Sequence, residues 1–430
     1  MSDIIALGTD GASLMTGRKF GVAKFLQDDS PHVVNIHCVA HRLNLCTSKA
    51  ADEVEYVGKV FQKTLTDLFY YFKKSACRVA ELAEVQKLLD DPQIKVKEVH
   101  EIRWFAMYNA LFTVYKTWRS LLRYVKKIDK RSSKEEEQLA NFTDYKFIFK
   151  LHVMMDVIPR FTELNLVFQK VDLDVSCVQP AVEGCLSCLK CALSGKSHYQ
   201  PLLKDKMILK KENDNVIAKY WGEKLHNYQA KKSEEIRDKF LNALQDRVEK
   251  RFPKESVSVS TAFSVMGLRS ISMLSEEDLV NYGKEEMEIL TNFYGSDRTG
   301  NGEYLSKAKI DQIGTRCEWG ILKRVVLKER YARDNFSKLW TEICAHHKSM
   351  FPNLLTLARL ALVVPLQTVD CELGFSCQNN IHNPARNRLC AERLNTLMLI
   401  KLEGKEVDEF DYVRALEKWK KKVDRRIFKA

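Results

Sequence analysis

The chain has 430 residues, of which 45% are hydrophobic and 29% are charged, and this excludes a single small module as well as a disordered or fibrous protein. Lysine and arginine number 69 against 57 acidic residues, and the net charge of +12 favours a polyanionic partner, with nucleic acid as the first candidate. No apolar run reaches the ~20 residues that span a bilayer, so no membrane partner is expected, and twelve cysteines without a secretory leader predict reduced thiols in the nucleus or cytosol.

The N-terminal segment predicts a strand, a helix and a second strand. A short apolar run at residues 4–7 leads into a glycine-rich turn, a helix is expected at residues 22–26, and the second strand at residues 33–36. A buried strand usually pairs with neighbours from adjacent sequence. A strand this close to Met1 therefore predicts a natural fold that begins upstream of a truncated start.

The middle of the chain is expected to be all-helical, because apolar residues recur at three- and four-residue steps from residue 39 onward. A β-like piece at residues 97–104 interrupts this pattern, and Ser133 with Glu136 is expected to form a capping box. Further helices are predicted over residues 106–125, 147–168, 216–228, 236–252 and 276–293, and four prolines punctuate this region: Pro159, Pro180, Pro201 and Pro253.

Asp10 directly follows the first predicted strand. Open α/β folds present ligand-binding side chains at the carboxyl ends of their strands, and a carboxylate fixed there can hold Mg²⁺ or Mn²⁺. The alternative is a turn residue whose side chain accepts hydrogen bonds from local backbone amides, and spacing alone favours this alternative.

Two groups of cysteine and histidine have the spacing of partial metal sites. Cys38 and His41 form half a zinc site, but no second pair lies nearby, so a packed Cys38 with His41 or Arg42 facing an anion is favoured. Three further cysteines recur at every third position, which suits one buried helix face better than a metal site: Cys185, Cys188 and Cys191.

Arg103 and Trp104 close the β-like piece. A tryptophan beside an arginine suits stacking on a base combined with a phosphate contact, as in proteins that hold unpaired nucleotides. The alternative, a half-buried core aromatic, is the more common role of a single tryptophan.

The C-terminal stretch contains the most apolar helix of the chain. Apolar residues between positions 354 and 362 surround nearly the whole helix, so it must be buried against either the rest of this chain or a second protomer. Glu372 has apolar neighbours in sequence, and a buried carboxylate needs a metal ion or a partner such as Arg386 or Arg388.

Four motifs, in this order along the chain, resemble the hAT superfamily of DNA transposases and the host proteins derived from it. Each motif alone is ordinary, and the helical region between them carries no matching motif. The matching segments are residues 9–17, residues 37–45, Arg103 with Trp104, and residues 351–389.

This resemblance implies an α/β fold with dominant α, in which an incomplete RNase H-like core is split by a large all-helical insertion. Residues 1–105 would be the N-terminal part of the core, lacking its first strands. Residues 106–335 would be the insertion. Residues 336–430 would be the dimerisation region that completes the core.

The resemblance also implies roles for individual residues. Asp10 matches the second acid of the catalytic triad and Glu372 the third, and both would bind metal only if the missing acid were supplied. The residues expected to bind DNA are His41, Arg42, Arg103 and Trp104. The residues expected to form the dimer interface are Phe351, Leu354, Leu357, Leu360 and Phe375.

Two departures from the family predict a vestigial catalytic site. The family's first acid lies upstream of Asp10, and Asp3 cannot replace it because it precedes the same strand. Leu373 stands where the family has an arginine beside the third acid. Because a site without one carboxylate cannot organise two metal ions, we expect no strand cleavage and no cofactor, with Mg²⁺ or Mn²⁺ bound only by a complete core.

The sequence therefore predicts a nuclear, catalytically incomplete protein derived from a hAT transposase, which dimerises through its C-terminal region and binds DNA. Basic residues at 123–131 and 418–426 suit phosphate contacts, although a solvated helix face has the same pattern. The alternatives are a fragment of an active metal-dependent transposase whose first acid is encoded upstream, and a protein-interaction scaffold or transcriptional regulator.

Overall fold

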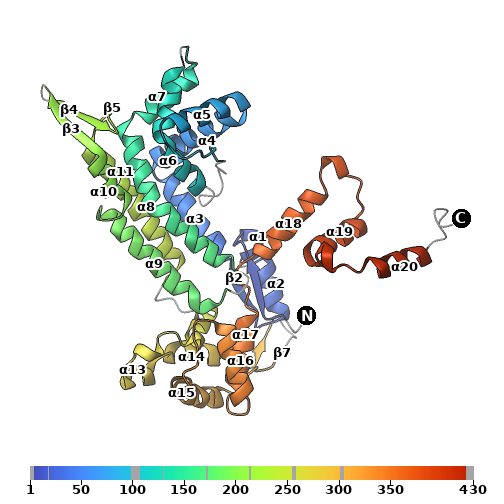
Figure 1. The fold of residues 1–430 in the computed structure, drawn as a ribbon. Helices are drawn as coiled ribbons and strands as arrows, with labels where there is room; N and C mark the ends of the chain where they lie inside the picture. The colour runs from blue at the N-terminus through green and yellow to red at the C-terminus, as the bar shows by residue number, and fades with distance from the viewer. Residues whose placement is uncertain are drawn as a thin grey trace. The chain divides into compact units, whose positions relative to one another are not determined.

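The computed structural model describes residues 4–17, 19–97, 107–128, 130–170, 173–212, 215–253, 258–300 and 305–422. The described chain is mostly helical (Figure 1). It divides into two compact units, Met1–Gln367 and Thr368–Ala430. Among the helices of the described residues, none is long and apolar enough to cross a membrane.

The first unit begins with the predicted strand, helix and strand. The strands β1 (Ala6–Thr9) and β2 (Val34–His37) are parallel neighbours, and Thr9 lies opposite His37. A parallel pair needs a crossover connection, which is supplied by α1 (Ser13–Thr16) and α2 (Val22–Asp29). The sequence pattern therefore predicts this part of the fold correctly.

A large helical core follows, with α8 (Tyr145–Phe168) at its centre. This helix is buried on nearly all sides and continues through Pro159, and Pro180 likewise lies inside α9 (Val175–Leu193). The helix predicted over residues 147–168 is therefore confirmed, and the packing of a buried helix outweighs the backbone hydrogen bond that a proline removes. The other elements around this core are α3 (Val39–Asp52), the π-helix η1 (Tyr56–Phe61), α4 (Gln62–Lys73), α5 (Ala76–Leu88), α6 (Met107–Lys127), α7 (Ser133–Phe142), α10 (Tyr199–Lys206) and α11 (Ala230–Arg251).

The capping box of α7 lies one residue earlier than predicted. The backbone N–H of Ser132 donates to the Glu135 carboxylate at 2.7 Å, and the Tyr71 hydroxyl donates to the same carboxylate at 2.7 Å. Tyr71 belongs to α4 and is far from Glu135 in the sequence. Its hydrogen bond explains why Glu135, and not Glu136, completes the capping box.

The expectation of an all-helical middle is wrong at residues 207–225. An antiparallel sheet stands where the sequence pattern predicts a helix over residues 216–228, and its strands are β3 (Met207–Glu212), β4 (Asn215–Tyr220) and β5 (Glu223–Leu225). Trp221 and Gly222 connect β4 to β5, and both have positive φ angles, of 51° and 81°. Two such residues favour a hairpin and interrupt a helix.

A second core joins the N-terminal strands to residues 259–366. Val34 and Ile36 of β2 pack there with Phe263, Trp340 and Leu357. The two ends of the first unit thus share one core. Its other elements are α12 (Val259–Ala262), the 3₁₀ turns η3 (Phe263–Gly267) and η4 (Ile271–Met273), α13 (Glu276–Asn281), α14 (Lys284–Tyr294), β6 (Arg298–Thr299), β7 (Leu305–Ser306), α15 (Gln312–Lys328), α16 (Phe336–His347) and α17 (Pro352–Leu362).

Gly283 divides the single helix predicted over residues 276–293 into α13 and α14. Its φ angle is 71°, and a Cβ at this position would lie 2.4 Å from the Val265 side chain. Only glycine combines this backbone conformation with so close an approach.

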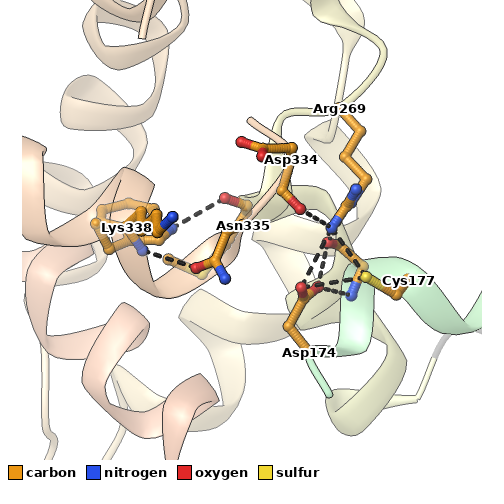
Figure 2. A network of polar contacts seen from close by, with 9 residues as sticks. Asp174, Cys177, Arg269, Asp334, Asn335 and Lys338 are labelled. Atoms are coloured by element: carbon orange, nitrogen blue, oxygen red, sulfur yellow. Dashed lines mark hydrogen bonds and ion pairs between the residues drawn. The ribbon is translucent and has the colours of Figure 1, made fainter. Parts of the chain in front are cut away.

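Arg269 connects the two cores at the start of α9 (Figure 2). Its guanidinium donates to Ser176 Oγ at 2.8 Å, to the Asp174 carboxylate at 3.2 Å and to the main-chain oxygen of Asp334 at 3.1 Å. Asp174 also caps α9 by accepting from the N–H of Ser176 at 2.9 Å. Since α9 contributes side chains to both cores, these bonds fix one core against the other.

The second unit buries very little of its apolar surface. In its described part, up to residue 422, only Cys377 and Ile381 are buried. α18 (Val369–Ile381) packs against α19 (Ala391–Glu403), and the remaining elements are η5 (Pro384–Arg386), η6 (Val407–Glu409) and α20 (Tyr412–Lys422). Many large apolar side chains are exposed, among them Leu373, Phe375, Leu399, Ile400, Leu402, Val413 and Leu416.

Candidate functional site

The carboxyl ends of β1 and β2 bring Asp10 and His37 to the same edge of the sheet. Thr9 lies opposite His37 in the strand register, and Asp10 is the next residue. Gly11 has a φ angle of 78° and lies so close to the imidazole that a Cβ there would be 2.4 Å from His37 Cε1. Glycine at position 11 therefore allows the backbone of this turn to approach the His37 ring closely.

The Asp10 carboxylate accepts a hydrogen bond within its own turn. Asp10 Oδ1 accepts from the backbone N–H of Ala12 at 2.9 Å, and Thr9 Oγ1 accepts from that of Gly11 at 3.2 Å. This is the arrangement expected of a turn residue. Within the described ranges, no group of three or more His, Cys, Asp or Glu side chains is placed to hold a metal ion. A metal-binding role for Asp10 therefore stays a prediction.

His37 is uncharged near neutral pH. Burial lowers its pKa to about 4, and the charges of Arg42, His41 and Arg251 act in the same direction, while Asp10 opposes them. The imidazole of His41 lies 5.7 Å from that of His37, measured between ring centroids. The charge at this edge is therefore carried mainly by the arginines.

The first turn of α3 places Cys38 inside and Arg42 at the surface. Cys38 is buried in the first core, as predicted, whereas His41 and Arg42 are partly exposed. The guanidinium carbon of Arg42 lies 4.2 Å from the centroid of the Phe252 ring. Burial is the main cause that lowers the pKa of Arg42, and Arg251 contributes in the same direction.

Arg42 lines a cavity of about 490 Å³ together with the end of α11. Lys250 and Arg251 provide two further cations, and the lining also includes four hydroxyl-bearing residues: Ser258, Ser260, Thr261 and Ser264. The sequence analysis does not identify Lys250 and Arg251, because they lie far from Arg42 in the chain. The one available signal is the basic last turn of the helix predicted over residues 236–252.

Three further residues are predicted to act in catalysis or DNA binding: Glu372, Arg103 and Trp104. Glu372 lies in the first turn of α18 and is exposed, which corrects the expectation of a buried carboxylate, because few side chains pack around α18. Asp10 and Glu372 belong to different units. Arg103 and Trp104, with most of the β-like piece that they close, lie outside the described residues.

The predicted dimerisation residues separate into a buried and an exposed set. Phe351, Leu354 and Leu357 have no exposed surface, because α17 packs inside the second core of a single chain, and Leu360 packs against that core. The structure therefore assigns these residues to the core and corrects their expected place at an interface. Phe375 is different, since 65% of its surface is exposed.

The three cysteines of α9 lie progressively closer to the surface. Cys185 is buried in the first core, and burial raises the pKa of its thiol. The Cys188 thiol donates to the main-chain oxygen of Asp156 at 3.7 Å, and Cys191 is exposed. Cys185 thus packs in the core, as the helical spacing predicts.

Part of the chain matches a known protein family. Residues 325–403 match the hAT family C-terminal dimerisation region. The matched segment runs from the end of α15 to the end of α19 and includes both the buried α17 and the exposed apolar residues of α18 and α19.

Proposed function

We propose that this chain, a relative of the hAT transposases through its dimerisation region, self-associates through α18 and α19 and binds DNA without cleaving it. The observation that carries the proposal is that the matched dimerisation region includes α18 and α19, in which only Cys377 and Ile381 are buried while Phe375 and Ile400 are exposed. A nuclear location follows from DNA as the partner.

The sparse core of the second unit supports self-association. A segment that buries only Cys377 and Ile381 in its described part gains too little from burial to offset the entropy lost on ordering its helices. Exposed apolar patches of this kind mark interaction surfaces. We infer that a second copy of the chain packs against this surface, because α18 and α19 belong to the segment that matches a dimerisation region.

Replacing Phe375 and Ile400 by Asp is expected to dissociate the oligomer. Both side chains are well exposed, at 65% and 64%, so the change should leave the fold intact, whereas an interface would have to bury two charges. We expect the dissociation constant to rise at least about 30-fold, since truncating a central interface residue typically costs ~2 kcal/mol or more. Light scattering during size-exclusion chromatography gives the mass of both proteins.

Ile313→Asp is the matched control for this variant. Ile313 is 74% exposed on α15 and lies outside residues 325–403, so the control should keep the oligomer of the wild type. If the Phe375 and Ile400 double variant also keeps it, α18 and α19 are not the interface.

Charge supports the DNA part of the proposal. The chain carries +12 in total, and Arg42, Lys250 and Arg251 gather at one cavity beside the strand ends. The Asp10 carboxylate accepts a hydrogen bond from the backbone of its own turn, which favours binding without strand cleavage.

DNA affinity is expected to fall steeply with salt. Each phosphate contact releases counterions, so a few contacts should lower the affinity roughly tenfold on modest increases in salt. Fluorescence anisotropy with a labelled duplex at several salt concentrations measures the slope, and gel analysis of the same duplex with Mn²⁺ should show uncut strands. Affinity that does not respond to salt would argue against phosphate binding, and cut strands against the loss of catalysis.

A further inference from the structure

We infer that the cavity between α3, α9, the end of α11 and α12 is a nucleotide site, in which Arg42 and Arg251 hold a phosphate and the apolar wall receives the nucleoside. The ligand is a phosphate monoester or diester attached to a nucleoside, supplied either as a free nucleotide or as the end of a DNA strand. This inference deepens the DNA-binding part of the proposed function and rests on it.

The first support is an excess of positive charge. Arg42, Lys250 and Arg251 line the cavity, and Glu286 is the one carboxylate among its described lining residues. None of the three cations forms an ion pair or hydrogen bond with another described residue. Neighbouring like charges repel each other. An anion in the cavity would relieve this repulsion.

The second support is that Arg42 is held in position. Arg42 lies on α3 with its guanidinium over the Phe252 ring, and Arg251, the last residue of α11, lines the same cavity. α3 and α11 pack directly against each other in the first core. Guanidinium groups fixed in this way suit phosphate, because their parallel N–H groups match two of its oxygens.

The third support is the size and lining of the cavity. A volume of about 490 Å³ lies within the ~300–1,000 Å³ of typical small-molecule sites and exceeds what a phosphate ion fills. Val178, Phe252 and Leu366 provide apolar surface, and the hydroxyls of Ser258 and Thr261 lie on the α12 side. A nucleotide combines a charged group with a flat, partly apolar body, which this lining matches.

The closing element of the site comes from the second core. Val39, at the start of α3, donates its backbone N–H to the main-chain oxygen of Leu366 at 2.9 Å. This hydrogen bond holds the segment after α17 against α3, and both Val39 and Leu366 line the cavity. The pocket therefore exists only when the two ends of the first unit are assembled.

Isothermal titration calorimetry of the full chain tests the inference with deoxyadenosine 5′-monophosphate as the probe. We expect measurable binding of the monophosphate and at least tenfold weaker binding of deoxyadenosine, which lacks the phosphate. Arg251→Met should weaken monophosphate binding about tenfold or more. Lys250→Met, a change at an exposed position of the same wall, should weaken it in the same direction without threatening the fold.

Arg247→Met is the matched control. Arg247 lies one turn earlier on α11 and donates to the Glu53 carboxylate at 2.9 Å, so it is engaged away from the cavity. The control removes the same charge from the same helix and should bind the monophosphate as the wild type does. Equal weakening by Arg247→Met and Arg251→Met would overturn the inference, as would a wild-type protein that does not bind the monophosphate at millimolar concentration.

A competition experiment distinguishes the two sources of the phosphate. If a 5′-phosphorylated single strand displaces the monophosphate and its unphosphorylated form does not, the site holds a strand end. If neither strand competes, the site holds a free nucleotide. Retention of duplex DNA is measured in parallel. If the protein retains duplex DNA but does not bind the monophosphate, the nucleotide site is rejected and the DNA part of the proposed function stands. If it binds the monophosphate but does not retain duplex DNA, the DNA part of the proposed function is rejected and the nucleotide site stands.

Discussion

Leu357→Asp is expected to unfold the first unit and not to release a stable monomer. Leu357 has no exposed surface and packs in the second core with Phe351 and Leu354. The substitution leaves a cavity and buries an unpaired carboxylate, and together these should cost more than about 4 kcal/mol of unfolding free energy. A typical domain has only ~5–15 kcal/mol in total, so most of the protein should be unfolded or insoluble.

Circular dichroism melts and soluble yield measure this effect, with Leu362→Asp as the control. Leu362 ends the same helix and is 49% exposed, so its substitution should change the unfolding free energy by less than ~1 kcal/mol. A folded, monomeric Leu357→Asp protein that melts like the wild type would show that Leu357 faces a second protomer after all.

Lys150→Met is expected to stabilise the chain at neutral pH. Lys150 is buried in the second turn of α8, its Nζ lies 4.3 Å from the centroid of the Phe240 ring, and that Nζ has no hydrogen-bond partner among the described residues. Burial lowers its pKa from 10.5 to about 7, and the charge of Arg237 adds to the effect. Such a fall corresponds to a penalty on the order of 5 kcal/mol for the charged form.

The same group should make stability depend on pH. Below pH 7 the lysine is charged in both the folded and the unfolded chain, so the whole penalty is present. Between about pH 7 and pH 10.5 the unfolded chain binds a proton that the folded chain does not, so the free energy of unfolding rises with pH. The rise from pH 7 to pH 9 should be about 2 kcal/mol in the wild type and absent from its Lys150→Met variant.

Urea denaturation at pH 7, 8 and 9 measures the difference between the two proteins at each pH. Lys239→Met, at an exposed position on α11, is the control and should follow the wild type throughout. Parallel curves for the wild type and Lys150→Met would mean that the buried amine keeps its proton in the folded chain.

Local patterns predict local structure well in this chain. The apolar runs near Asp10 give β1 and β2 to within about two residues, since short buried strands next to glycine-rich turns have few alternatives. Local patterns do not predict the hairpin of β4 and β5. Its apolar residues at 216, 217 and 220 also fit a helical spacing, and the positive φ angle of Trp221 has no signal in a residue that rarely adopts it.

Long-range placement is what the sequence cannot supply. The all-round apolar pattern at residues 354–362 predicts burial correctly, yet periodicity does not tell whether the covering surface is the same chain or another copy. The site beside the strand ends has the same difficulty. Arg42 is identified by its motif, but its partner Arg251 becomes a neighbour only when α3 and α11 pack together.

The core shared by both ends of the first unit has a consequence for synthesis. β1 and β2 leave the ribosome before their partners at residues 259–366, which follow after tens of seconds of elongation at ~5–20 residues per second. The helices from α3 to α11 are completed in between and contain their own core. We therefore expect the helical core to fold on the ribosome before the two strands are buried. Until the residues that cover them are synthesised, β1 and β2 stay accessible to chaperones.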